Sequence, residues 1–182
     1  MADVTDSHGV SLSSSQTSSI NVGMVIEPNF NIKIKSITKN ASSTSTVGYV
    51  MAMDGTILAQ ANFSSNVATF STPPTLTAGT KYRVNADKAG ASRTYRRGSV
   101  SSLYPIADTN VDWTGGDANG AEVSNYAYEI ESVTTEVVAA FGKINIGDSW
   151  KDVSEVKINI GDSWKTVTDI KINIGDAWKS LA

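Results

Sequence analysis

Oxygen-bearing side chains stand at every second position of one segment, a spacing that can wrap around a calcium ion. Asp108, Asn110 and Asp112 supply carboxylate and amide oxygens, which are the ligands that calcium takes in proteins. A calcium-binding loop with this start needs glycine where Trp113 stands and a bidentate glutamate where Asn119 stands. We therefore expect a loop whose polar side chains face water, with a calcium site as the alternative, and we predict no other metal site.

Three aromatic residues of the central region could bind a ligand. Trp113, Tyr95 and Tyr104 carry flat, amphipathic rings that could stack on sugar rings if they are exposed. The alternative is that they belong to the hydrophobic core, where large aromatic side chains contribute most of their packing area. The first interpretation predicts carbohydrate binding, and the second predicts packing alone.

Cysteine and histidine, two residue types that often serve covalent and acid–base catalysis, are almost absent. The chain has no cysteine and a single histidine, His8, in a polar N-terminal stretch. This argues against disulfides, thiolate chemistry, a histidine-ligated zinc site and a histidine-based catalytic triad. No paired-carboxylate, phosphate-binding-loop or nucleophile-elbow pattern occurs. We expect a protein that is not an enzyme and that needs no cofactor.

Charge and hydropathy argue against two classes of partner. The 182-residue chain has a net charge of −3 and a sequence pI of about 5.1, which is unlike a protein that binds nucleic acid by neutralising phosphates. No stretch approaches the roughly 18 apolar residues of a membrane span. The N-terminus also lacks the basic and apolar regions of a secretory signal. We expect neither nucleic-acid binding nor membrane insertion.

The composition favours strands and turns over helices. Serine and threonine together number 42, and there are 13 asparagines and 14 glycines. Residues 1–19 are polar and rich in serine. We expect a flexible arm there, with ordering against a neighbouring subunit as the alternative.

Residues 20–138 show the pattern of a β-domain. Short apolar runs recur between turn residues, and Ile32 and Ile34 alternate with lysines as in a half-buried strand. About eight such strands, separated by regular turns, indicate an all-β domain, a β-sandwich of jelly-roll type.

Two turn signals stand inside this domain. The Asp54-Gly55 pair lies between two apolar runs and predicts a hairpin with a type I′ turn. The glycines, aspartates and asparagines of about 107–121 predict a loop.

The last 40 residues contain an internal repeat. Three units, KINIGDSWKDVSEV, KINIGDSWKTVTDI and KINIGDAWKSLA, begin at Lys143, Lys157 and Lys171 and therefore recur every 14 residues. In each unit an alternating apolar run is followed by Gly-Asp, which suits a two-residue turn, and by a second short strand. Residues 143–182 therefore predict a C-terminal meander of three β-hairpins.

The register of each hairpin decides which side chains share a face. With a two-residue turn Asn159 pairs with Trp164, so that isoleucines take one face and tryptophans the other. So short a segment cannot bury two apolar faces alone, and we expect repeats from several copies, most simply three, to intertwine. The residues expected to pack in this way are Trp150, Trp164, Trp178, Ile144, Ile146, Ile158, Ile160, Ile172 and Ile174. Packing on the β-domain and, for the tryptophans, stacking on sugars are the alternatives.

The repeats KINIGDSWK and KINIGDAWK resemble the short Gly-x-x-Trp-Lys repeats found near the ends of tailed-phage structural proteins, including tail fibres, head fibres and minor tail proteins. The runs TVGYVMAMDGTILAQANFSSNVATF and PTLTAGTKYRV make the β-domain similar to jelly-roll modules of the same class. The resemblance implies a virion component without enzymatic activity, often a homotrimer, that contacts other virion proteins.

Two functions from different classes follow from these patterns. The first is a structural protein of a bacteriophage-like virion, a fibre, tail or capsid-decorating component that self-assembles through its repeats. The alternative is a carbohydrate-binding module for host attachment, whose partner is a host-surface glycan and whose exposed aromatic residues are those named above.

Overall fold

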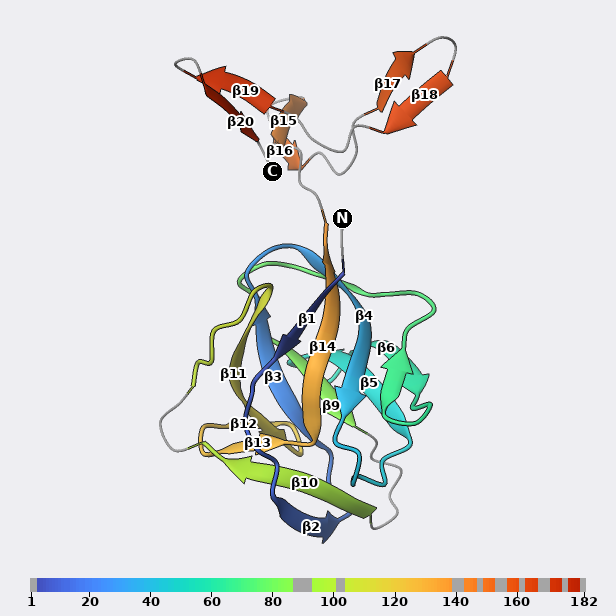
Figure 1. The fold of residues 1–182 in the computed structure, drawn as a ribbon, viewed down its shortest axis with the longest axis vertical. Coiled ribbons are helices and arrows are strands. Elements are labelled where there is room, and N and C mark those ends of the chain that lie inside the picture. The colour runs from blue at the N-terminus through green and yellow to red at the C-terminus, as the bar shows by residue number, and fades with distance from the viewer. Residues whose placement is uncertain are drawn as a thin grey trace. The chain divides into compact units, whose positions relative to one another are not determined.

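The structure is a computed structural model of the chain, and it divides into two compact units, Met1–Val137 and Val138–Ala182 (Figure 1). The structure describes residues 3–86, 93–100 and 104–138, except for the side chain of Arg93; residue 138 is the first residue of the second unit. In the second unit the description covers the backbone of six short strands between residues 143 and 180. Each unit is considered by itself.

All regular elements of the described residues are strands, so the expectation of an all-β protein is confirmed. Within this part of the chain, no helix has the length and apolar character needed to cross a bilayer. The strands of the first unit are β1 (Val4–Ser7), β2 (Ser14–Ser18), β3 (Val22–Pro28), β4 (Ile32–Lys39), β5 (Val47–Ala52), β6 (Ile57–Asn62), β7 (Val67–Thr69), β8 (Thr75–Leu76), β9 (Tyr82–Ala86), β10 (Arg93–Ser99), β11 (Val111–Ala118), β12 (Ala121–Val123), β13 (Tyr126–Tyr128) and β14 (Ile130–Val137).

These strands form three antiparallel sheets. Sheet A has the order β1-β14-β4-β7, and β8 also pairs with β4. Sheet B has the order β13-β10-β2 and lies at the lower end of the unit in Figure 1. Sheet C is the widest, with the order β12-β11-β3-β9-β5-β6.

The main hydrophobic core combines residues of sheets A and C, so these two sheets pack in the manner of a sandwich. Ile32 and Ile34 of β4 meet Met24 and Ile26 of β3 in one buried cluster, which also contains Trp113 of β11. All five side chains are fully buried. The alternation predicted for β4 is confirmed, because Lys33 between the two isoleucines is exposed.

A bulge in β4 changes which residues face the core after Ile34. In the pairing with β14, Lys35 has no partner of its own, so β4 holds one extra residue. An extra residue reverses the faces that the following residues occupy. Ile37 and Lys39 are consequently buried. The Lys39 ammonium donates a 2.5 Å hydrogen bond to the backbone oxygen of Ser43, and burial lowers the pKa of Lys39.

The N-terminal segment is part of the folded unit, and the predicted flexible arm over residues 1–19 is wrong. Strand β1 pairs with β14, and β2 pairs with β10. Backbone pairing does not depend on side-chain polarity, so a serine-rich segment can still form an edge strand. The side chains of Asp6 and His8 are buried despite their polarity.

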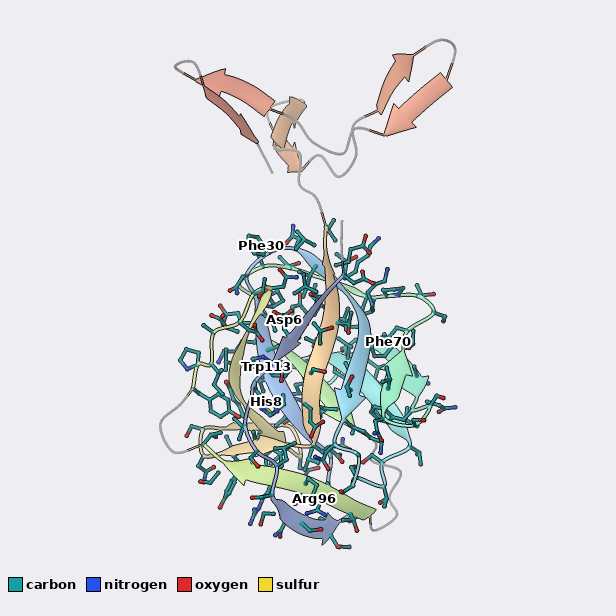
Figure 2. The ribbon with its side chains drawn as sticks, in the orientation of Figure 1. Asp6, His8, Phe30, Phe70, Arg96 and Trp113 are labelled. Carbon is teal, nitrogen blue, oxygen red and sulfur yellow. The ribbon has the colours of Figure 1, made fainter. Side chains whose placement is uncertain are left out.

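Contacts with neighbouring residues explain why these two polar residues can be buried. The Asp6 carboxylate accepts from the backbone N–H of Asn110 at 2.8 Å and from the Thr135 hydroxyl at 3.2 Å. The His8 ring lies edge-on to Trp113, with centroids 5.2 Å apart and an angle of 89° (Figure 2). Buried polar groups with such partners cost little, and composition alone does not reveal the partners.

The predicted hairpin at Asp54-Gly55 is confirmed, but its turn is not of type I′. Strands β5 and β6 pair as expected, and only Gly55 in the turn has a positive φ, of 94°. The N–H of Gly55 donates to the oxygen of Ala52, whose own N–H donates to the oxygen of Thr56. This is a three-residue loop, a type I turn followed by a left-handed glycine.

The predicted loop over about 107–121 is largely a strand, so this prediction is wrong. Strand β11 runs through the segment and pairs with β3, and Asn119-Gly120 then turns the chain into β12. Both turn residues have positive φ, 54° for Asn119 and 89° for Gly120, as a type I′ turn requires. Gly115 and Gly116 lie within β11, where a Cβ atom would come within 2.7 Å and 2.3 Å of neighbouring atoms.

In the second unit the strands pair within each repeat. The strands are β15 (Lys143–Ile146), β16 (Ser149–Asp152), β17 (Lys157–Ile160), β18 (Ser163–Thr166), β19 (Lys171–Ile174) and β20 (Ala177–Ser180). Asn145 lies opposite Trp150 in the first pair, and Asn159 opposite Trp164 in the second. Each pair is a separate two-stranded sheet. Each strand of this unit pairs only with the other strand of its own repeat, so the described strands do not form the continuous meander that was predicted. The residues of the predicted turns lie outside the described residues.

Candidate functional site

The register of sheet C aligns polar residues in one row across four strands. Asp117 of β11 lies opposite Gly23 of β3, Gly23 opposite Asn85 of β9, and Asn85 opposite Tyr49 of β5. Val84, which precedes Asn85 in β9, belongs to the core between the sheets. Because successive residues of a strand point to opposite faces, this row lies on the face of sheet C that is turned away from the core.

Gly23 makes the contact between the polar residues possible. A Cβ atom at this position would overlap the backbone oxygen of Val84 and the side-chain oxygen of Asn85. Without it, the Asn85 amide reaches across β3 and donates a 2.5 Å hydrogen bond from Nδ2 to Oδ2 of Asp117. Both side chains are buried, with 1% of Asn85 and none of Asp117 exposed.

Arg83 lies two residues before Asn85 in β9, on the same face of the sheet, and its side chain reaches the carboxylate of Asp117. Its Nε lies 3.9 Å from Oδ1 of Asp117, an ion pair that is too long for a hydrogen bond. Its Nη2 donates a 2.6 Å hydrogen bond to the backbone oxygen of Gly120. The Asn119-Gly120 turn thus holds the guanidinium at the end of β11.

These residues surround an open pocket of about 240 Å³. One side is polar and the other is apolar, formed by Tyr49, Met51 and the exposed side chain of Ile57. The full lining consists of Asn21, Tyr49, Met51, Gly55, Ile57, Arg83, Asn85, Asp117, Asn119 and Gly120. The volume is below the roughly 300–1,000 Å³ of pockets for drug-sized ligands, so it suits a smaller molecule.

Two carboxylates near the pocket respond to burial and to the charge of Arg83. Burial raises the pKa of Asp117, while the hydrogen bond from Asn85 and the charge of Arg83 act in the opposite direction. At the Asp54-Gly55 turn, the backbone N–H of Thr56 lowers the pKa of Asp54, and the charge of Arg83 adds to this effect. Arg83 therefore faces two carboxylates.

Several buried polar atoms at the pocket have no hydrogen-bond partner within the protein. They are Oδ1 of Asn21, Oδ1 of Asn85, Oδ1 of Asp117 and Nε of Arg83. Among the residues with described side chains, seven buried side-chain atoms lack a partner, and these four all line this one pocket. Such atoms are rare in native proteins, and a cluster of them indicates a site where solvent or a ligand supplies the missing bonds.

The three aromatic residues predicted to bind a ligand do not form an exposed platform. Trp113 is fully buried between the sheets, and Tyr95 is 5% exposed in a second cluster with Tyr128. Tyr104 is half-buried, and its hydroxyl donates a 3.0 Å hydrogen bond to the oxygen of Tyr126. Trp113 and Tyr95 thus contribute to two different hydrophobic clusters, where burial removes their large ring area from water.

The calcium candidates are used in hydrogen bonds within the protein. Asp108 accepts from the backbone N–H of Ser7 at 2.6 Å, and Asp112 accepts from the Asn29 amide at 3.2 Å. The Asn110 amide is buried and donates to the Thr135 hydroxyl at 2.8 Å. The described residues contain no group of three or more histidine, cysteine, aspartate or glutamate side chains arranged to hold a metal ion.

The pocket residues were missed from sequence because they are far apart in the chain and of ordinary types. Asn21, Arg83 and Asp117 come together only through the pairing of β3, β9 and β11. Asn119-Gly120 was the one local signal, since this dipeptide favours a hairpin turn. The predicted tryptophans and isoleucines of the repeats are placed by register only, in the strand pairs described above.

The site offers hydrogen-bonding groups beside apolar side chains. This chemistry suits binding. The fold makes the chain an all-β, sandwich-like protein with paired strands near its C-terminus. No protein-family model and no curated protein matches the chain.

Proposed function

We propose that the chain is a non-enzymatic structural component of a bacteriophage-like virion, a fibre, tail or capsid-decorating protein. In this proposal residues 20–138 are a jelly-roll-like sandwich that contacts other virion proteins, and residues 143–182 are hairpin repeats that join copies of the chain. The observation that carries the proposal is the set of three strand pairs that recur at a spacing of 14 residues, beginning at Lys143, Lys157 and Lys171.

Isolated pairs of strands need a partner. A two-stranded sheet is marginally stable in water at best, and an unpaired strand edge attracts another strand. The three described pairs are separate two-stranded sheets, so each presents its outer edges to further strands. Because the repeats are nearly identical, the same edge is offered three times, which favours association with copies of itself.

The charge of the repeats is compatible with such association. Residues 143–182 contain six lysines and six acidic residues, so their net charge is zero. Copies of this segment would therefore meet without net repulsion. Three chains around one axis can cover both faces of each pair and close the assembly, which is why we propose a homotrimer.

Light scattering after size exclusion tests the proposal. The full chain is expected to have a solution mass near three times 19.2 kDa. A variant ending at residue 142 is expected to have the mass of one chain, because it lacks the strand pairs. A monomeric full chain, or a truncated chain that remains trimeric, would contradict self-association through the repeats.

For the alternative function, carbohydrate binding through exposed aromatic residues, two of the three aromatic residues named in the central region are not exposed. Trp113 and Tyr95 are buried, so neither ring can stack on a sugar. The structural proposal does not depend on these residues.

A further inference from the structure

We propose that the pocket on the outer face of sheet C binds one neutral sugar residue, with Asn21, Arg83, Asn85 and Asp117 as its polar contacts. This inference goes beyond assembly through the repeats and does not depend on it. All the lining residues belong to the first unit.

The missing hydrogen bonds define the chemistry of the ligand. Three of the four unpartnered atoms are acceptors, the Oδ1 atoms of Asn21, Asn85 and Asp117, and one, Nε of Arg83, is a donor. A complementary ligand must therefore donate several hydrogen bonds and also accept one. Hydroxyl groups do both, and a sugar carries several of them within a few ångströms of one another.

The charges exclude the simple ionic ligands. An anion drawn to Arg83 would lie near the carboxylates of Asp117 and Asp54, whose two negative charges outnumber the single charge of the guanidinium. A cation drawn to the three oxygen acceptors would lie against the guanidinium. In both cases a like charge nearby opposes binding, so a neutral ligand fits best.

The apolar wall fits the other side of a sugar ring. Tyr49 and Met51 of β5 lie beside Asn85 and Arg83 of β9, and Ile57, which is 49% exposed, also lines the pocket. The C–H face of a pyranose can cover such a surface while its hydroxyl groups face the polar residues. The pocket of about 240 Å³ has room for one ring rather than for an oligosaccharide.

Arg83 controls access to the buried acceptors. Asp117 and Asn85 are almost completely covered, whereas the Arg83 side chain retains 12% exposure. The hydrogen bond to the Gly120 oxygen is the one that fixes the guanidinium, because the contact with Asp117 is 3.9 Å long. A shift of this side chain lets a ligand hydroxyl group donate to Oδ1 of Asp117 and accept from Arg83 in turn.

Methyl NMR spectra of the full-length chain test the inference. The probes are the methyl glycosides of D-glucose, D-galactose, D-mannose and N-acetyl-D-glucosamine, each added separately. Binding is expected to shift the methyl signals of Met51 and Ile57 to saturation with at least one glycoside. These signals report on the pocket whether the chain is monomeric or trimeric, so the result is independent of the assembly experiment.

Two variants and a matched control show whether the polar residues of the pocket bind the glycoside. Asp117→Asn keeps the shape of the side chain but replaces one carboxylate oxygen, an acceptor, by an amide NH₂ group, a donor. Arg83→Leu removes the guanidinium and with it the donor Nε. Each is expected to weaken glycoside binding about tenfold or more, since a hydrogen bond to a charged group contributes at least that factor. The control is Arg96→Leu, because Arg96 also donates to one backbone oxygen, that of Ser13, but lies outside the pocket.

Three results would overturn the inference. The first is that no glycoside shifts the Met51 and Ile57 signals. The second is that Arg96→Leu weakens binding as much as Arg83→Leu. The third is that inorganic phosphate shifts the same signals and competes with the glycoside, which would assign the pocket to anions.

Discussion

At the scale of single residues, hydrogen bonds decide the protonation state of His8. The ring nitrogen Nδ1 accepts from the backbone N–H of Val10 at 2.9 Å, so it carries no proton. The other nitrogen, Nε2, lies 2.8 Å from the backbone oxygen of Ile130 and donates to it. The buried ring is therefore neutral, and burial lowers the pKa of His8.

Acid is expected to destabilise the first unit through His8. Because the pKa is lower in the folded state than its ordinary value of 6.5, this contribution to stability is complete above pH 6.5. It decreases as the pH falls through the lowered pKa, by up to about 1.4 kcal/mol per pH unit for one proton. Urea unfolding of the chain at several pH values between 8 and 5, which bracket the ordinary pKa, measures how the free energy of unfolding changes with pH.

The control for this prediction is His8→Gln, which keeps an amide donor but cannot titrate. The variant is expected to lose the part of the pH dependence that begins near pH 6.5. An equal slope in the variant and the original chain would show that His8 does not cause the dependence.

At the scale of elements, turns place residues of separate strands at one site. The Asn119-Gly120 turn joins β11 to β12, and its Gly120 oxygen holds the guanidinium of Arg83 on β9. The bulge in β11 between Trp113 and Gly115 has a comparable effect, because it changes the face that the residues beyond it occupy. Trp113 thus enters the core, while Asp117 reaches the pocket.

Gly120→Val is expected to destabilise the first unit and to move Arg83. The backbone φ of +89° is unfavourable for a β-branched residue by about 1–2 kcal/mol. A Cβ atom at this position would also lie 3.5 Å from Nη1 of Arg83, so a larger side chain crowds the guanidinium. Chemical denaturation measures the loss of stability.

Asn119→Gly is the matched substitution in the same turn. Asn119 also has a positive φ, of 54°, which glycine adopts without strain, so the stability is expected to change by less than about 0.5 kcal/mol. If Gly120→Val and Asn119→Gly lower the stability of the first unit equally, backbone strain at position 120 does not cause the loss of stability.

At the scale of the whole molecule, the first unit has a core of its own. Its buried clusters are formed by residues of the first unit, and sheets A and C enclose the larger one. A domain of this size buries enough apolar surface to fold without help. We therefore expect the first unit to fold without the repeats.

A chain ending at residue 142 is expected to unfold cooperatively, with a melting temperature within about 2 °C of the first-unit transition in the full chain. The physical reason is that the described buried clusters consist of residues of the first unit. Differential scanning calorimetry at several protein concentrations measures this. A truncated chain that is unfolded, or that melts without cooperativity, would contradict the independence of the first unit.

Local patterns in the sequence were enough for the class of fold and for several elements. The alternation around Ile32 and Ile34 predicted β4, and Asp54-Gly55 predicted the hairpin of β5 and β6. In the second unit Asn159 pairs with Trp164, while the two-residue turns of the repeats stay a prediction because they lie outside the described residues. Each of these features depends on neighbours within about ten residues, where side-chain period and turn preference act directly.

The sequence by itself therefore determined that the chain forms strands, where several of them turn, and how often the C-terminal units recur. Only the tertiary structure decided that the serine-rich N-terminus is ordered, that Trp113 is buried, and that Asp117 meets Asn85 and Arg83. The physical reason is the same in each case. Pairing between distant strands and the hydrogen bonds that make burial of a polar group tolerable join residues up to about 130 positions apart, as in the bond between Asp6 and Thr135, and no local pattern encodes such partners.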